Sequence, residues 1–354
     1  FPLKSWEIFF RMDLMCYLRK QKARTMKNRK FVIGLLALVV ANVIWGLMAP
    51  IIKGLLNMEV MSGMTVSALR IIGGTILFWL IDLLAPSGMV KHEKIQKKKD
   101  WMMLVIGGIV YIVGTMALTN IGAEYTYPVD AVVCSSTTPL FALACGAIFY
   151  YHKFPAFTKI LGVLLGLLGV LIFIFTTEDN PAMHVSNPLI GDLLCVISQI
   201  CNAVYLVFFV EITSRYTAFT MMKWMFTFAC VAILPFTIAD VIAVPWSTLS
   251  GEAIFDITYI VVLASFVSYL LISFAQHSVT PTLIAMGNYI QPLTAAIASI
   301  IIGMAVVTVY NIVATALIFI GVILVQRNTG RLKIDHPEGS GEPAGKQIGK
   351  TVKA

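Results

Sequence analysis

Long apolar segments, separated by short polar ones, make up most of this chain of 354 residues. A hydrocarbon core about 30 Å thick is crossed by a helix of about 20 apolar residues. The segments are unbroken and lack the strict alternation of barrel strands, so helices are predicted. Ten segments fit, covering roughly residues 31–56, 62–85, 101–122, 128–150, 157–177, 189–210, 219–239, 256–276, 282–303 and 306–325. The fold class predicted is an all-α membrane protein with ten transmembrane helices.

Basic residues set the orientation of these spans. Of the 26 Lys and Arg residues, 24 lie on one side of a ten-span topology, the exceptions being Lys53 and Arg70. The positive-inside rule makes that side cytoplasmic, with both termini on it. Hydrophobic residues form 58% of the chain and charged residues 12%, which excludes an ordinary soluble domain. The net charge of +8 is therefore a topology signal and predicts no nucleic-acid partner. A contact of the basic segment 91–100 with lipid is a second hypothesis.

Two matching segments indicate an internal repeat. Pro139-Leu140 and Pro292-Leu293 lie 153 residues apart, and each pair precedes a run of small residues. The next spans, at 165–173 and 317–325, match at an offset of 152. Agreement over two consecutive spans argues against chance. Five spans is an odd number, so halves at 31–177 and 189–325 form an inverted repeat, an architecture of many secondary transporters.

The two ends lie outside this repeat. Residues 1–30 form a basic cytoplasmic extension, in which Met26 of "MKNRKF" has the character of a natural start. Residues 1–25 are then an upstream extension, or alternatively an amphipathic surface helix. The tail at 326–354 is rich in Gly, Pro and Lys and is predicted to be disordered.

Several stretches resemble one transporter family. "NVIWGLMAPIIKGLL" in the first span and "ALRIIGGTILFWL" in the second resemble the opening of the EamA family, within the drug/metabolite transporter superfamily. "TYPVDAVVCSSTTPLFALACGA" and "SVTPTLIAMGNYIQPLTAAIAS" resemble the ends of its two halves. The resemblance implies ten helices and export of small metabolites across a bacterial inner membrane. The chain departs from the family where a Gly-Glu pair commonly follows spans four and nine.

Polar side chains inside the spans provide the candidate substrate site. Residues three apart share a helix face, and unpaired polar groups are costly in hydrocarbon, so these faces are expected to point inward. Interhelical hydrogen bonding without a ligand is the alternative explanation. The candidate substrate-binding residues are Asn42, Trp45, Gln199, Asn202, Tyr269, Asn288, Tyr289 and Gln291.

Prolines and charges within the spans provide candidates for gating or coupling. Pro292 is expected to kink the ninth span and open the turn at Asn288, and Pro139 to kink the fourth. Lys53 and Asp130 share the inward faces of their spans. For Arg70 and Glu124 we favour neutralisation by other charges or extension toward the outer interface.

Three classes of function remain open. A secondary transporter is favoured, moving amino acids or amphipathic compounds by alternating access and coupled to protons or another ion. The alternatives are an intramembrane enzyme, such as a lipid-linked transferase or protease, and a non-transporting binding protein. The sequence has no His-Glu-x-x-His, no metal-ligand spacing and no Walker A motif, so no catalytic residue, metal or cofactor is predicted. The "GVLLG" segment carries Gly162 and Gly166, a glycine pair that lets two helices approach closely. We favour packing within one subunit over dimerisation for this pair, and both a monomer and a homodimer remain possible oligomeric states.

Overall fold

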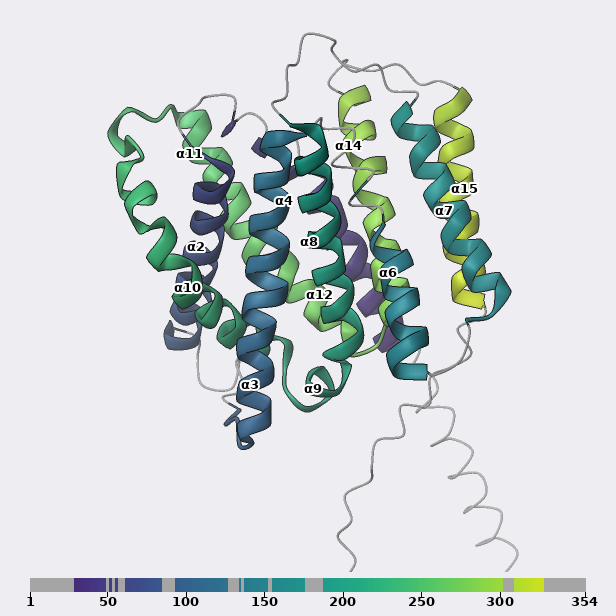
Figure 1. The fold of residues 1–354 in the computed structure, drawn as a ribbon, viewed down its shortest axis with the longest axis horizontal. Coiled ribbons are helices and arrows are strands. Elements are labelled where there is room, and N and C mark those ends of the chain that lie inside the picture. Colours follow the sequence, from purple (N-terminus) through teal and green to yellow (C-terminus); the bar gives the residue numbers. More distant parts are fainter. Residues whose placement is uncertain are drawn as a thin grey trace, which may run out of the picture.

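The structure is a computed structural model, and all the regular secondary structure in the residues it describes is helical (Figure 1). The described residues are 29–48, 51–52, 55–56, 61–84, 93–126, 134, 137–151, 155–175, 187–301 and 309–327. The N-terminal extension, the C-terminal tail, Lys53 and Asp130 lie outside these residues.

The first half begins with a helix at Arg29–Met48 and continues through five labelled α-helices. The later elements are α2 (Gly63–Leu84), α3 (Lys98–Gly107), the π-helix η1 (Gly108–Val113), α4 (Gly114–Tyr125), α6 (Thr138–Cys145), the π-helix η2 (Gly146–Tyr151) and α7 (Phe157–Phe175). Because α3, η1 and α4 follow one another without a break, they form one long helix, Lys98–Tyr125.

The second half repeats this pattern. Its elements are α8 (Pro188–Phe208), α9 (Val210–Arg215), α10 (Ala218–Ala243), the 3-10 turn η3 (Trp246–Thr248), α11 (Gly251–Thr258), the π-helix η4 (Tyr259–Val267), α12 (Ser268–Gln276), α13 (Pro281–Met286), the 3-10 turn η5 (Gly287–Tyr289), α14 (Ile290–Ile301) and α15 (Val309–Arg327). Here too a π-helix lies within a continuous helix, Gly251–Gln276. Each half therefore has one long helix that is π-helical near its middle.

Six helices in the described residues are long and apolar enough to cross a membrane. They are Arg29–Met48, Gly63–Leu84, Lys98–Tyr125, Leu189–Phe208, Ala218–Ala243 and Gly251–Gln276. Three shorter apolar helices, at Thr138–Phe149, Phe157–Gly169 and Ile312–Val325, fall within predicted spans four, five and ten. The ninth predicted span is divided into α13, η5 and α14. The structure thus gives six full-length candidates where the sequence predicts ten spans.

The two prolines begin helices instead of kinking them. Pro139 is the second residue of α6, after a turn at Thr137, and Pro292 is the third residue of α14, after the 3-10 turn η5. The turn expected to open at Asn288 is the 3-10 segment η5, directly before the helix that contains Pro292. A proline in the first turn lacks an N–H that has no intrahelical partner there, so it favours a helix start.

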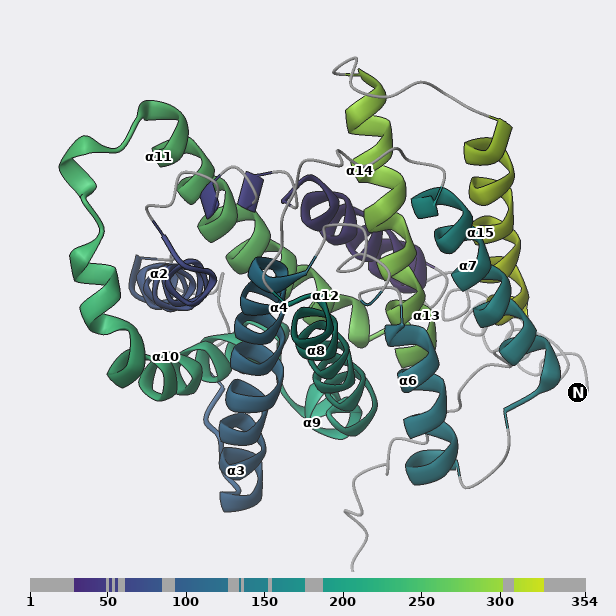
Figure 2. The same ribbon diagram turned by 45° about the horizontal axis from the view of Figure 1, so that its top comes forward.

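Helices from the two halves pack side by side. α2 packs on α10, and α7 packs on α15, as both ribbon views show (Figures 1 and 2). The α7–α15 contact requires glycine, because a Cβ on Gly162 would lie 2.7 Å from the carbonyl oxygen of Gly321. A Cβ on Gly169 would likewise lie 2.6 Å from the Ala314 carbonyl. The glycines of the "GVLLG" segment thus serve packing within the chain.

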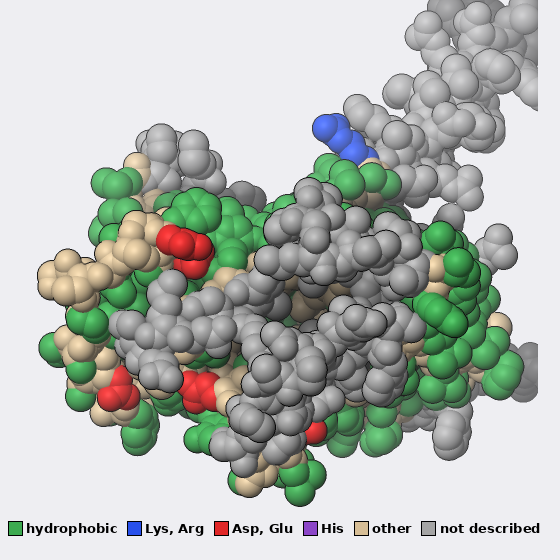
Figure 3. Space-filling view, turned by 90° about the horizontal axis from the view of Figure 1, so that it is seen from above, with side chains coloured by type: hydrophobic (Ala, Val, Ile, Leu, Met, Phe, Trp, Pro, Cys, Tyr) green, Lys and Arg blue, Asp and Glu red, His purple; other side chains and the backbone are tan. Residues whose placement is uncertain are grey.

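Charged residues separate toward opposite ends of the helices. In Figure 1, α11 lies toward the top and α3 toward the bottom. The first turn of α11 contains the acidic Glu252, and α3 begins with the basic Lys98 and Lys99. The view from above shows acidic side chains on the top face (Figure 3). At the bottom, Lys94, Lys97, Lys98 and Lys99 are all exposed. This separation agrees in direction with the distribution of basic loops along the sequence.

Candidate functional site

A hydrogen-bonded network of amides lies between the first helix and the η5–α14 segment. Asn42 is fully buried, and its Oδ1 accepts a 3.0 Å hydrogen bond from Nε2 of Gln291. The same Nε2 approaches Oδ1 of Asn288 at 3.4 Å. Backbones come close here, because a Cβ on Gly46 would lie 2.7 Å from the Gln291 carbonyl oxygen. The 3-10 turn presents Asn288 at this contact, directly before the helix that Pro292 starts.

Thr138 extends the network to the second half's first helix, α8. Its Oγ1 accepts a 2.8 Å hydrogen bond from Nδ2 of Asn288 and donates one of 2.6 Å to Oε1 of Gln199. Nε2 of Gln199 then donates to Oγ of Ser198, which also accepts from Thr119 of α4. Thr138, Gln199 and Asn288 are all buried. One continuous polar path therefore crosses the apolar bundle and alternates between the halves.

The network follows the internal repeat. Adding the offset of 153 residues to Thr138 gives Gln291, so the two side chains occupy equivalent positions before their prolines. Gln291, in the second half, bonds to Asn42 on the first helix of the first half. Thr138, in the first half, bonds to Gln199 on α8, the first helix of the second half. Equivalent elements thus make equivalent contacts with chemically different side chains.

A cluster of aromatic rings lies near the amides, because Trp45 is on the same helix as Asn42. Trp45, one helical turn after Asn42, meets Tyr269 edge to face at 5.4 Å, and Tyr269 lies 5.2 Å from Tyr111. Tyr111 stacks on Tyr205 at 3.7 Å. The hydroxyl of Tyr269 shares a 3.0 Å hydrogen bond with Thr115. Two of these rings, Trp45 and Tyr269, were predicted site residues.

Arg70, on α2, is only 3% exposed. Its Nε donates a 3.0 Å hydrogen bond to Oγ of Ser265, and Nη2 lies 3.5 Å from the Ala264 carbonyl. The Trp45 indole donates to that same carbonyl at 2.7 Å. The expectation that Arg70 extends to the interface was therefore wrong, because α2 buries it against η4. Glu124 instead accepts a hydrogen bond from the backbone N–H of Gly63.

The structure separates other predicted site residues from the network. The Tyr289 hydroxyl donates to the Val163 carbonyl at 3.1 Å, and its ring fills the space beside Gly166. This side chain is thereby engaged in packing on α7 and presents no free hydroxyl to the network. Asn202 is half-buried on α8, without a hydrogen-bond partner among the described residues. Lys53 and Asp130 are not among the described residues.

Several participants were not singled out from the sequence. Tyr111 and Thr115 have an ordinary appearance in an apolar span, whereas Ser265 shares the polar face of its span with Tyr269. Their roles depend on which helices meet, which helical periodicity does not specify. The π-helical segments η1 and η4 contribute Tyr111 and Ser265, and short π segments often occur at functional sites.

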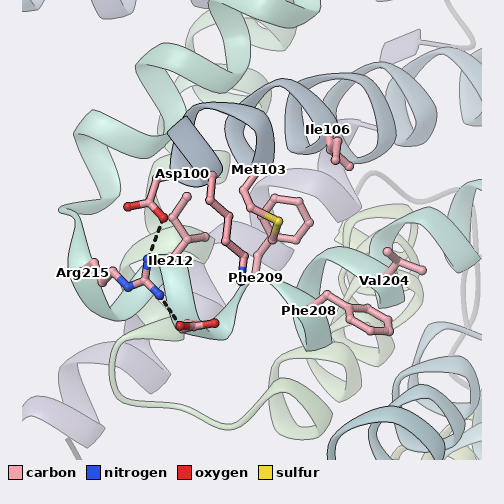
Figure 4. Close-up of a pocket in the computed structure, with 10 residues that line it drawn as sticks. Asp100, Met103, Ile106, Val204, Phe208, Phe209, Ile212 and Arg215 are labelled. Carbon is pink, nitrogen blue, oxygen red and sulfur yellow. Dashed lines mark hydrogen bonds and ion pairs between the residues drawn. The ribbon is translucent and has the colours of Figure 1, made fainter. Parts of the chain in front are cut away.

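A separate pocket of about 450 Å³ lies at the basic end, between α3 and the α8–α9 corner (Figure 4). Asp100, almost fully buried, pairs with Arg215 at 2.6 Å and accepts a 2.8 Å hydrogen bond from the Tyr216 hydroxyl. Burial raises the pKa of Tyr216, and the hydrogen bond to the Asp100 carboxylate raises it further. Arg215 also pairs with Glu211. These contacts connect the first turn of α3 to the end of α9 and to Tyr216, which lies between α9 and α10.

These features define a membrane protein of two helical halves with a buried polar centre. Comparison with known proteins identifies the family: the model of the EamA-like transporter family matches residues 32–175 and again 189–327. The chain therefore belongs to the EamA-like transporter family, which confirms the resemblance found in the sequence. Its two family domains together account for most of the chain.

Relatives and a solved structure agree with this assignment. An uncharacterized transporter of Archaeoglobus fulgidus is 23% identical over 221 residues, 62% of this chain and 71% of the relative. The uncharacterized transporter YyaM of Bacillus subtilis is 27% identical over 128 residues, or 36% of this chain and 40% of the relative. One crystal structure shares the fold with a TM-score of 0.64 at 14% identity, covering 85% of this chain and 97% of the other. The chain is thus similar to membrane transporters, and the comparisons point away from an enzyme.

Proposed function

We propose that the protein is a secondary transporter that exports small metabolites by alternating access between two five-helix halves. The observation that carries the proposal is the polar network from Asn42 through Gln291, Asn288 and Thr138 to Gln199. It crosses the helical bundle at the surface where the halves meet. Polar groups in that position mark substrate pathways in transporters.

The strength of this network suits a protein that must change conformation. Four of its hydrogen bonds join the halves: Asn42–Gln291, Thr138–Asn288, Thr138–Gln199 and Thr119–Ser198. Hydrogen bonds between membrane helices contribute about 0.6 kcal/mol each on average, so the set contributes roughly 2–3 kcal/mol. Conformations that interconvert during function differ by a few kcal/mol. Substrate or water can replace these bonds when the halves move apart.

In this proposal ten spans form an inverted repeat with halves at 31–177 and 189–325 and both termini in the cytoplasm. The basic loops and the charge separation along the helices support this orientation. Residues 1–30 and 326–354 are then cytoplasmic segments. The membrane is a bacterial inner membrane, and Lys53, Asp130 and the two proline turns take part in gating or coupling.

The partners that follow are a small-molecule substrate, the bilayer, and protons or another coupling ion. Amino acids and amphipathic compounds fit a site that combines amides with aromatic rings. The remaining alternatives are an intramembrane enzyme and a binding protein that does not transport. Either monomer or homodimer is compatible with the packing of the halves.

Purified protein in proteoliposomes tests the proposal. Pooled metabolites are screened for uptake or release with and without a pH gradient, using Gln199→Leu and the control Thr237→Val. Thr237 is buried on α10 and donates a hydrogen bond to the Ile233 carbonyl of its own helix. We expect gradient-dependent flux of at least one compound, reduced by Gln199→Leu and retained by Thr237→Val. Absence of flux for every pool, or equal flux in Gln199→Leu, would contradict the proposal.

A further inference from the structure

A buried guanidinium without a counter-charge lies next to the proposed transport site. Arg70 belongs to α2, and only 3% of its surface is exposed to solvent. It contacts η4 through Ser265 and Ala264. No Asp or Glu among the described residues forms an ion pair with it. The other buried cation among the described residues, Lys223, is paired with Asp82 at 3.0 Å.

The contacts of Arg70 leave most of its hydrogen-bonding capacity unused. A guanidinium has five N–H donors and stays charged at any physiological pH. Ser265 and Ala264 engage two of these donors, the second at the long distance of 3.5 Å. A buried charge is costly unless it is both paired and hydrogen-bonded. An anion that approaches the remaining donors would supply the counter-charge and further hydrogen bonds.

The surroundings of Arg70 specify what kind of anion fits. The Trp45 indole shares the Ala264 carbonyl with Arg70, and Tyr269 follows Ser265 by one turn of helix. These rings provide flat apolar surfaces beside one positive charge. A single guanidinium matches the single negative charge and planar fork of a carboxylate, and suits it better than a phosphate dianion. An apolar body attached to that carboxylate can pack on the rings.

We propose that Arg70 anchors the carboxylate of a small organic substrate whose apolar body lies against Trp45 and Tyr269. This proposal rests on the proposed transport function and names its substrate class. Nε of Arg70 is held by Ser265, so the outer edge of the guanidinium faces the ligand. The amide network from Asn42 to Gln199 then contacts the polar groups at the other end of the molecule.

Three probes with one common body test the charge requirement. They are 3-phenylpropionate, 3-phenylpropionamide and 3-phenylpropylamine, which carry a carboxylate, a neutral amide and an ammonium group. Binding to the purified full chain is followed by tryptophan fluorescence and by the shift in Tm. We expect the carboxylate to bind about tenfold or more tightly than the amide, the scale of a charge-assisted hydrogen bond, and the ammonium to bind least.

Variants then assign the preference to Arg70. Arg70→Gln should make the carboxylate and amide equal, and Arg70→Lys should keep part of the preference, because an ammonium retains charge but lacks the fork. Ser265→Ala should weaken carboxylate binding by about twofold to fivefold and leave amide binding unchanged, on the scale of one neutral hydrogen bond. The exposed Arg29→Gln is the matched control and should bind all three probes like the wild type. If Arg70→Gln does not fold, Arg70→Lys and Ser265→Ala decide the question.

The outcomes separate this proposal from the transport proposal. No response of the wild type to the carboxylate, equal responses to carboxylate and amide, or a preference that survives Arg70→Gln would each overturn the role of Arg70. A variant that only lowers Tm, with the preference intact, would show that the arginine is structural. Counterflow of the same probes in proteoliposomes tests transport. Carboxylate binding without counterflow of any probe would support the role of Arg70 and contradict the transport function. Counterflow without a preference for the carboxylate would support transport and contradict the role of Arg70.

Discussion

The hydrogen bond between Asn42 and Gln291 can be tested for its contribution to stability. In Asn42→Leu, Nε2 of Gln291 loses its 3.0 Å partner and keeps only the 3.4 Å contact with Asn288. Asn42 Nδ2 bonds to the Leu38 carbonyl of its own helix, so the interhelical loss falls on Oδ1. Leaving a buried donor without a partner costs about 1–3 kcal/mol. Each single variant, Asn42→Leu or Gln291→Leu, should lose an amount in that range.

The double variant is more informative than either single change. When both side chains are replaced, no amide is left without a partner. The double variant should therefore lose about 1 kcal/mol less unfolding free energy than the two single variants together, a coupling energy within the range found between membrane helices. The free energy of unfolding is measured for the four proteins by denaturant titration in bicelles. Asn42→Leu combined with Thr237→Val should instead be additive, because Thr237 bonds within α10. Additivity of Asn42→Leu and Gln291→Leu within about 0.3 kcal/mol would refute a direct bond between them.

Three further predictions concern other parts of the chain. Gly162→Val should lower the free energy of unfolding by about 1–3 kcal/mol because its Cβ would meet the Gly321 carbonyl; Gly251→Ala, where nothing lies within 4 Å, is the control, and equal stabilities would contradict the close contact. The raised pKa of Tyr216 adds stability that is present below the unfolded pKa of about 10 and is lost as pH rises above it. Unfolding at pH 8–11 should therefore show a steeper alkaline loss in wild type than in Tyr216→Phe, and parallel curves would exclude this linkage. Pro292→Ala restores a backbone donor in the first turn of α14 and should leave the unfolding free energy within about 1 kcal/mol while reducing flux in proteoliposomes; unchanged flux would mean that the proline only starts the helix.

The sequence predicted the architecture better than the site. Apolar length and the offset between Pro139 and Pro292 are local and periodic signals, and the family match to two consecutive segments agrees with them. The predicted ten spans nevertheless appear as six long helices, with shorter or divided helices at the rest. Composition shows that a segment is apolar enough for a bilayer. It does not show where a 3-10 turn such as η5 interrupts it.

Neighbouring residues illustrate why site prediction was incomplete. Asn288 and Tyr289 are adjacent in sequence, yet Asn288 faces Thr138 and Tyr289 faces Val163 on α7. Successive residues of a helical turn point roughly 100–120° apart, so two polar neighbours in one span face different helices. Helical periodicity predicts that Asn288 and Gln291, three residues apart, share one helix face, and in the structure their side chains lie 3.4 Å apart. It could not identify Thr138 as the partner, because that contact depends on how the halves pack.

The repeat also explains how one chain can have two equivalent contacts with different chemistry. Gln291 and Thr138 occupy equivalent positions, but Nε2 of Gln291 only donates, to Asn42 and to Asn288. The Thr138 hydroxyl both accepts from Asn288 and donates to Gln199. Among the described residues, Asn288 joins the two equivalent pairs, since it contacts both Thr138 and Gln291. A movement that separates α14 from α6 would break the network at this residue and leave each pair intact within its own set of helices. Such a movement differs from a separation of the two halves, which would also break the Asn42–Gln291 and Thr138–Gln199 bonds that join them.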